Sequence, residues 1–205
     1  MTKHENPKET WEQRFDNDSY IFGEEPNEYL RSQLKLLKPG NVLSIADGEG
    51  RNSVWLAKKD FEVDAFDFSS NAIRKAQRLA DANNVIVNFH NIDWQSFNWK
   101  KNHYDNIVGI FFQFAGPEDR MKIFNHIDAS LKPGGVVVLQ GYSTAQMKFN
   151  TGGPGKLEHL YDEKILVTAF KHYELLDIRT YESEIHEGTS HKGMSGLIGF
   201  VAKKP

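Results

Sequence analysis

The sequence predicts an α/β protein built on one doubly wound sheet of seven strands, mostly parallel, with an antiparallel strand from a C-terminal hairpin. Three observations lead to this prediction. Residues 42–69 read as a buried strand, a glycine-rich turn, a helix and a second strand that ends in an acidic residue. Apolar segments then alternate with helical patterns as far as residue 142, and two long strand-like segments follow. Such alternation is typical of a parallel sheet with helices on both faces.

The helices are predicted from apolar positions three or four residues apart and from capping residues at their ends. Proline and glycine end the first helix, serine caps the third, and a proline followed by two acids opens the fourth. The apolar face of the fourth helix is expected to consist of Met121, Phe124, Ile127 and Leu131. The predicted helices are residues 27–37, 51–59, 69–80, 116–131 and 162–171.

The strands are predicted from short runs of apolar residues bounded by turn residues. The two C-terminal strands are expected to form a hairpin at the sheet edge, with a polar loop over residues 187–196. The predicted strands are residues 42–46, 62–68, 85–91, 104–112, 136–142, 173–184 and 193–203. We expect a single domain overall, in which residues 1–38 form an N-terminal helical lid on a ligand-binding domain of residues 39–205.

The bulk composition excludes several classes of protein. The 205 residues suffice for one α/β domain, and a net charge of −3 with no basic stripe argues against nucleic acid as a partner. The absence of cysteine excludes a disulfide framework, a cysteine nucleophile and a cysteine-ligated zinc site. The start of the chain is polar, and no apolar run approaches the ~20 residues that span a bilayer. We therefore expect a cytoplasmic protein without a membrane partner.

The turn after the first strand indicates what kind of ligand is bound. Gly48 and Gly50 permit a tight turn and a close approach of the backbone, but a dinucleotide fingerprint would have a third glycine where Ser53 stands. Asp47 and Glu49 would repel a pyrophosphate and tolerate a cationic sulfonium. The turn favours an adenosine ligand without phosphate, and S-adenosyl-L-methionine (SAM) fits. The alternative is a tight loop that binds nothing.

Acidic residues after the second and third strands are candidates for binding the adenosine. Asp67 ends the second strand, where a carboxylate accepts both ribose hydroxyls, and Phe68 can pack on the adenine. Asp93 can accept from the adenine amine between the apolar walls of Ile92 and Trp94. The alternatives are an acid that stabilises a helix N-terminus for Asp67, and an Asx turn for Asp93.

A set of motifs in this order resembles the class I SAM-dependent methyltransferases, and within them the tellurite-resistance/thiopurine-methyltransferase-like group. The resemblance covers nearly the whole chain and implies a Rossmann-like fold, SAM as cofactor and methyl transfer. The motifs are residues 11–15, 20–27, 48–52, 131–135, 151–154, His191-x-Gly193 and 202–205. Two departures are Ser44, where the family usually has aspartate, and Ala46, where it has glycine. We expect Ala46 to be tolerated if its φ is negative.

The resemblance also implies roles for side chains near the site. In the lid, Arg14 is expected to pair with the SAM carboxylate; the alternative is a surface helix with one buried tryptophan. Gln113 and His191 are candidate catalytic residues, although His191 also fits a solvated hairpin loop. No metal site is expected, because the spacing of His186, Glu187 and His191 does not match a zinc helix.

Besides the candidate catalytic residues Gln113 and His191, the predicted site has two groups of residues. The candidate cofactor-binding residues are Trp11, Arg14, Ala46, Asp47, Gly48, Glu49, Asn52, Asp67, Phe68, Ser69, Ile92, Asp93, Trp94, Ile110 and Phe111. The candidate substrate residues are Tyr20, Phe22, Asn27 and Tyr142.

The leading functional hypothesis is a SAM-dependent methyltransferase, monomeric or homodimeric, that acts on a small molecule such as a thiol or a metalloid oxyanion. The departures at Ser44 and Ala46 support an alternative, a SAM- or nucleoside-binding protein with weak or lost transfer activity. An NAD-dependent enzyme is a third hypothesis.

Overall fold

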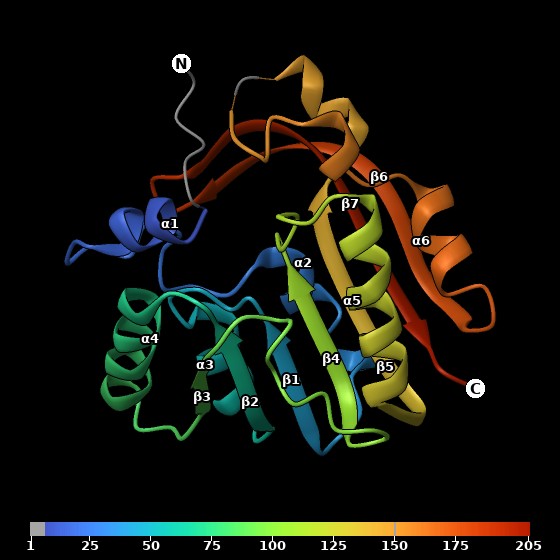
Figure 1. Ribbon diagram of the computed structural model, residues 1–205, viewed down its shortest axis with the longest axis horizontal. Coiled ribbons are helices and arrows are strands. Elements are labelled where there is room, and N and C mark those ends of the chain that lie inside the picture. The colour runs from blue at the N-terminus through green and yellow to red at the C-terminus, as the bar shows by residue number, and fades with distance from the viewer. Residues whose placement is uncertain (1–6, 150) are drawn as a thin grey trace.

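The computed structural model describes residues 7–149 and 151–205, in which a single sheet forms the centre of the molecule (Figure 1). Its seven strands lie in the order β3-β2-β1-β4-β5-β7-β6. Strands β1 to β5 pair in parallel, whereas β7 pairs antiparallel with both β5 and β6. The predicted fold class, a Rossmann-like doubly wound sheet closed by an antiparallel hairpin strand, is confirmed.

The strands are β1 (Asn41–Ile45), β2 (Glu62–Asp67), β3 (Asn88–Asn91), β4 (Tyr104–Ile110), β5 (Leu131–Tyr142), β6 (Glu174–Glu187) and β7 (His191–Lys203). The α-helices are α1 (Pro7–Phe15), α2 (Glu28–Ser32), α3 (Arg51–Ala57), α4 (Ser70–Ala82), α5 (Pro117–Ser130) and α6 (Glu163–Ala169). Short 3-10 helices lie at η1 (Leu34–Leu36), η2 (Thr144–Lys148) and η3 (Leu157–His159).

The two faces of the sheet bury separate apolar clusters. Neighbouring residues of a strand point to opposite faces, so Val42 packs with residues of α2, α3 and α4, while Leu43 packs with residues of α5 and α6. Helix α4 shows why the pattern in the sequence is informative. Ser69 accepts from the Ala72 N–H as N-cap, and Ala72, Ala76 and Leu79, which lie three or four residues apart, are buried.

Several element boundaries differ from the prediction. The expected helix over 27–37 is split into α2 and η1, and the third strand has only four residues because it pairs only with Asp64–Asp67 at the sheet edge. Met121 is 42% exposed, and Ile123 takes the buried place on α5. The predicted polar loop over 187–196 is wrong. Strand pairing continues to Glu187 and His191, which leaves a turn of three residues, 188–190.

The N-terminal segment packs on the core by polar contacts. The Glu12 carboxylate accepts from Ser69 Oγ and from the backbone N–H groups of Ser70 and Asn71 at the start of α4. The helix dipole favours an acid at this place. No helix in the described ranges is long and apolar enough to cross a bilayer. The lid function of residues 1–38 stays a prediction, and residues 1–6 of that segment lie outside the described ranges.

A buried ion pair holds the same segment against the loop after β1. Lys75 and Glu49, whose side chains are 0% and 1% exposed, form an ion pair between α4 and this loop. Lys75 Nζ also donates to Ser19 O at 2.6 Å, and Glu49 Oε2 accepts from Phe22 N at 3.2 Å. Each charge of the pair therefore also anchors the backbone of the N-terminal segment.

We predict that Lys75→Met lowers the free energy of unfolding by about 3–5 kcal/mol, because it leaves Glu49 charged and buried without its partner. Urea denaturation measures the change. Lys59→Met, at an exposed lysine in the same part of the fold, is the matched control and should stay within about 0.5 kcal/mol of the wild type. A second change, Glu49→Gln, should restore part of the loss. A loss below about 1 kcal/mol for Lys75→Met alone would contradict the account.

Candidate functional site

A cavity of about 380 Å³ lies at the carboxyl ends of β1, β2, β4 and β5, where open α/β sheets bind ligands. Residues of the N-terminal segment and of the β6–β7 turn also line it. The structure thus brings together residues that are far apart in the chain. Fourteen of the predicted site residues line this cavity: Trp11, Arg14, Phe22, Ala46, Asp47, Gly48, Asn52, Asp67, Phe68, Ile110, Phe111, Gln113, Tyr142 and His191.

Asp67 has a carboxylate fixed by the backbone at the end of β2. Its Oδ2 accepts from Gly48 N at 3.0 Å and its Oδ1 accepts from Ser69 N at 2.9 Å. Each oxygen keeps a lone pair for a further donor. Burial raises the pKa of Asp67 to about 6, although the two N–H donors act in the opposite direction. The group is therefore an oriented acceptor that is ionised at neutral pH.

Both oxygens of the Asp47 carboxylate accept hydrogen bonds from side chains of the protein. Ser44 Oγ donates to its Oδ1 at 2.6 Å and Ser53 Oγ donates to its Oδ2. Burial raises the pKa of Asp47, and the two hydroxyls partly offset this. Ser44 replaces an aspartate of the family pattern, but the loop keeps a buried carboxylate because Asp47 supplies one three residues later.

The backbone is strained at two positions that line the cavity. Ala46 has φ +48° and Phe111 has φ +54°, in the left-handed region that costs an L-residue about 1–2 kcal/mol. The condition for tolerating Ala46, a negative φ, is not met. Strain of this kind gathers at functional sites, where the surrounding structure holds the residue in place.

Aromatic rings surround His191 on the other side of the cavity. The imidazole lies 4.4 Å from the ring of Phe22, 4.3 Å from that of Phe111 and 5.8 Å from that of Tyr142, measured between centroids. Burial lowers the pKa of His191, so the ring is neutral at pH 7. Within the described residues, the Tyr142 hydroxyl and His191 Nδ1 are buried without a hydrogen-bond partner. Buried polar atoms without partners are rare, and here both belong to residues that line the cavity.

The catalytic prediction for Gln113 does not fit its contacts. Its amide lines the cavity, but Nε2 donates to Tyr142 O at 2.8 Å and to His159 O at 3.2 Å, while Oε1 accepts from Tyr142 N. Both amide N–H groups are used. Gln113 therefore joins the ends of β4 and β5 to the segment at η3, and it has no donor left for a substrate.

Three other predicted site residues hold the N-terminal segment and do not line the cavity. Glu49 pairs with Lys75, so the expected acidic surface of the turn is absent. Ser69 caps α4 and donates to Glu12. Tyr20 donates through its hydroxyl to Lys75 O at 2.9 Å. A pattern of residue types does not show which acid or hydroxyl has an internal partner, so the sequence could not show that these three residues lie outside the cavity lining.

Three of the four predicted adenine contacts, Ile92, Asp93 and Trp94, lie outside the residues that line the cavity, whereas Phe68 lines it. Asp93 accepts from Ser96 N at 2.8 Å in a local turn, which matches the Asx-turn alternative, and Ile92 and Trp94 flank it. Asn27 caps α2 and lines a second cavity of about 650 Å³, described below.

Sequence reasoning missed several residues of the cavity. Arg51, Lys156, His159 and Ser190 line it, and none was a candidate. One signal for two of them was available. Lys156 and His159 follow β5, and loops after the carboxyl ends of strands are where ligands bind. Ser190 gave no such signal, because it reaches the cavity only through the bend of the hairpin.

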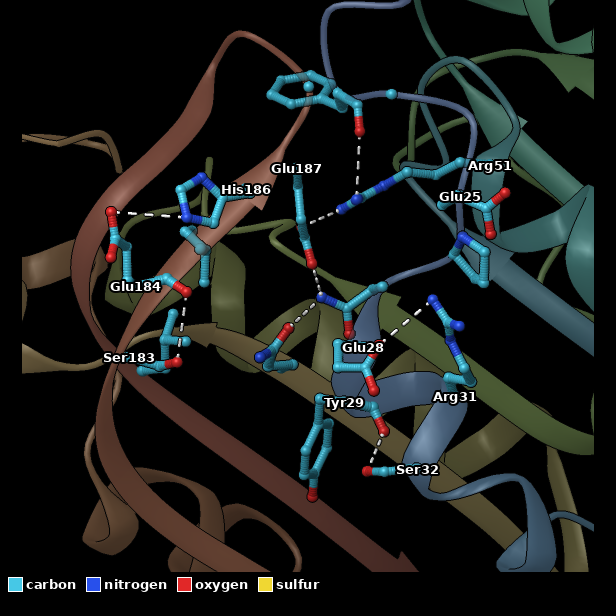
Figure 2. Close-up of a pocket in the computed structure, with 18 of the residues that line it drawn as sticks. Glu25, Glu28, Tyr29, Arg31, Ser32, Arg51, Ser183, Glu184, His186 and Glu187 are labelled. Atoms are coloured by element: carbon cyan, nitrogen blue, oxygen red, sulfur yellow. Dashed lines mark hydrogen bonds and ion pairs between the residues drawn. The ribbon is translucent and has the colours of Figure 1, made fainter.

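The second cavity lies beside the first, between α2 and the β6–β7 hairpin (Figure 2). Phe22 and Arg51 line both cavities. Arg51 and Glu187 point toward one another there and form an ion pair of 2.7 Å, with side chains only 7% and 14% exposed. This pair belongs to the wall between the cavities.

Comparisons with known proteins agree with this architecture. A profile of the family described as "Methyltransferase domain" matches residues 42–135. The probable S-adenosyl-L-methionine-dependent methyltransferase TehB of Haemophilus influenzae (strain 10810) is 24% identical over 155 residues, which cover 75% of this chain and 52% of that protein. The glycine/sarcosine N-methyltransferase of Halorhodospira halochloris is 27% identical over 156 residues, 74% of this chain and 54% of that protein. The chain spans about half the length of these curated relatives.

Solved structures share the fold. TehB from Haemophilus influenzae superposes with a TM-score of 0.72 at 19% identity, over 97% of this chain and 67% of that one. The N-methyltransferase NodS from Bradyrhizobium japonicum WM9, in complex with S-adenosyl-L-homocysteine, superposes with a TM-score of 0.75 at 15% identity, over 98% and 100% of the two chains.

We predict that Ala46→Gly raises the free energy of unfolding by about 1 kcal/mol, because glycine adopts a positive φ without the steric cost that alanine carries. Thermal and urea unfolding measure the change. The control, Ala129→Gly on the exposed face of α5, should destabilise the protein by about 1 kcal/mol, since glycine disfavours a helix. A destabilised Ala46→Gly protein would show that Ala46 is not strained.

Proposed function

We propose that this chain, which belongs to the class I SAM-dependent methyltransferases and within them to the TehB-like group, transfers a methyl group from SAM to a small molecule. The single observation that carries the proposal is the position of Asp67. Its fixed carboxylate ends β2 beside the turn at Gly48, on the same cavity as a cluster of aromatic rings. An acid at this place in the fold accepts the ribose hydroxyls of an adenosine ligand.

The residues of the cavity fit SAM in three respects. Asp67 offers lone pairs for the ribose, and Phe68 lies next to it for the adenine. The rings of Phe22, Phe111 and Tyr142 offer faces that attract a sulfonium by cation–π contact. Arg14 lines the cavity from α1, where it covers Trp11 at 4.5 Å and donates to Ser190 Oγ at 3.3 Å. We propose that Arg14 pairs with the carboxylate of the cofactor, as a guanidinium does in a fork.

The acceptor pocket is proposed to be the aromatic side of the cavity, around His191 and Tyr142. The Tyr142 hydroxyl, buried without a partner, is the donor that orients the acceptor. The total volume of about 380 Å³ favours a small acceptor such as a thiol or a metalloid oxyanion. The relatives include a glycine/sarcosine N-methyltransferase and a probable SAM-dependent methyltransferase, so the acceptor has to be found by a screen.

When bound, SAM would supply a methyl group on a positively charged sulfur: the acceptor lone pair would form the new bond to the methyl carbon as the S–C bond breaks and its electron pair stays on sulfur. The chain positions the two reactants and excludes water. His191, neutral because burial lowers its pKa, accepts the proton that a neutral acceptor loses. An anionic acceptor has no proton to lose, and for it His191 acts as a polar contact only.

The alternative is a SAM-binding protein with weak or lost transfer activity, and the strain at Ala46 favours it. A fold of this kind does not by itself fix the chemistry. The structure described as the [4+2]-cyclase SpnF superposes on this chain with a TM-score of 0.72 at 14% identity.

Calorimetry with SAM, S-adenosylhomocysteine and NAD tests the cofactor, and a methyl-transfer screen across thiols, selenite, tellurite, amines and phenols tests the reaction. We expect the two SAM-type ligands to bind and NAD not to bind. Binding without transfer to any acceptor would favour the alternative. If neither SAM-type ligand binds, both hypotheses fail.

We predict that the affinity for S-adenosylhomocysteine falls about tenfold per pH unit below pH 6. The free protein binds a proton at Asp67 with a pKa of about 6, and the ribose hydroxyls need the ionised form, so protonation competes with the ligand. Above pH 6 the affinity should level off. Calorimetry at several pH values measures this.

Asp67→Asn should weaken binding at pH 7.5 at least about tenfold, or about 1.4 kcal/mol, and should remove the pH dependence. Asp81→Asn, at an exposed acid of α4, is the control and should bind as the wild type does. Unchanged affinity in Asp67→Asn would contradict the assigned role of Asp67.

A further inference from the structure

Glu187, which the sequence analysis considered only in a zinc motif that it rejected, lies at the point where four parts of the chain meet. It ends β6, and its carboxylate accepts from Arg51 Nη2 at 2.7 Å and from Asn27 Nδ2 at 2.7 Å. Its Oε2 lies 3.7 Å from His191 Nδ1 across the β6–β7 turn. Figure 2 shows Glu187 reaching toward Arg51 beside the second cavity. Glu187 therefore contacts helix α3, the cap of α2 and the imidazole that lines the cofactor cavity.

The partners of Glu187 are themselves fixed. Arg51 Nη1 donates to Phe22 O at 3.3 Å, and the Asn27 amide also donates to Gln140 Oε1 at 2.7 Å. The turn that joins Glu187 to His191 is held as well, because a Cβ on Gly188 would collide with the backbone of residues 21–23. The Glu187 carboxylate is therefore held in place next to the His191 ring.

From this geometry we infer that Glu187 is a positioning residue, which fixes the ring of His191 with Nδ1 toward its carboxylate and leaves Nε2 for the methyl acceptor. The catalytic consequence rests on the proposed function, whereas the coupling between the two side chains does not. A carboxylate next to one ring nitrogen selects the tautomer that carries its proton there, so the other nitrogen is the basic one. Nδ1 is enclosed and makes no hydrogen bond within the described residues, and the Glu187 carboxylate 3.7 Å away is the charged group that faces it.

The charges around His191 act in opposite directions. Burial lowers its pKa, Glu187 raises it, and the cations Arg51 and Arg14 lower it. The same neighbours act on Glu187, whose pKa burial would raise but which His191 and Arg51 lower to about 2. Tyr142 also faces the ring, but burial raises its pKa far above neutral, so it carries no charge. Glu187 is thus the negative charge that opposes two positive ones at this imidazole.

Two substitutions, one that removes a negative charge and one that removes a positive charge near His191, test the inference. In Glu187→Gln the His191 pKa should fall by about one pH unit, and in Arg51→Gln it should rise by a similar amount, because charges within ~4–6 Å shift a pKa by such amounts. NMR titration of the histidine ring signals measures both. His172, which is half exposed and distant in the chain, serves as an internal reference. Simple damage to the packing would move His191 toward the ordinary histidine pKa in both variants, and equal signs would therefore overturn the inference.

Kinetics test the catalytic consequence with an acceptor that carries a proton. Glu187→Gln should lower kcat about tenfold or more with little change in the KM for SAM, and should move the acid limb of the pH profile to lower pH. Glu187→Asp, which keeps the charge, should recover part of kcat. Glu184→Gln, on the same strand and with a side chain 61% exposed, is the matched control and should behave as the wild type does.

The coupling between Glu187 and His191 and the proposed methyl transfer can each be contradicted without the other. Titration shifts of opposite sign in a protein that transfers no methyl group would support the coupling and count against the proposed function. Transfer activity with an unmoved His191 titration, or with an unchanged kcat in Glu187→Gln, would overturn the role assigned to Glu187.

Discussion

The backbone contact between Ile21 and the β6–β7 turn is the constraint on which the site depends. Ile21 O accepts from Thr189 N at 2.9 Å and from Ser190 N at 3.0 Å. These bonds join the start of the chain to a hairpin almost 170 residues later (Figure 1). Without them, Trp11, Arg14 and Phe22 would not face His191, and the cavity at the strand ends would lack its outer wall. Only glycine fits at position 188, because the Ile21 backbone lies where a Cβ would be.

The sequence predicted the sheet and the place of the cavity because both follow from short-range rules. Apolar periodicity gave the strands and helices, and the carboxyl ends of parallel strands meet at one edge. The place of Asp67 at the cavity was predicted in this way, since Asp67 ends β2. The partners of Asp47, Glu49 and Gln113 were not predictable, because each depends on side chains brought together by the fold. For His191 the sequence left a catalytic residue and a solvated loop both open, since a long, polar, glycine-containing hairpin gives no sign of where pairing stops.

The departures in the turn after β1 have unequal physical consequences. Ser44 replaces a carboxylate of the family pattern, but its hydroxyl donates to Asp47, so a buried carboxyl group and its hydrogen bonding are supplied by a different residue. Ala46 has no such compensation, because the strain lies in its own backbone at φ +48°. The surrounding contacts hold it: Asp47 N donates to Phe66 O at 3.0 Å, and Gly48 N donates to Asp67. The loop thus keeps its shape at a cost in stability.

The distribution of acids around the cavity suits a reaction that removes a positive charge. Of the acids discussed above, Asp47 is bound by two serines, Glu49 by Lys75 and Glu187 by Arg51. Asp67 is left as the acid with lone pairs for a ligand, and it lies at the sugar end of the proposed cofactor position.

A carboxylate next to the sulfonium would stabilise the cation more than the transition state, in which that charge is being lost, and would slow the transfer. Aromatic faces attract the cation more weakly, so they bind it with a smaller penalty on the rate. The internal hydrogen bonds and ion pairs of these acids therefore bear on the chemistry as well as on stability, because they occupy carboxylates that would otherwise be free to contact the sulfonium at its proposed position.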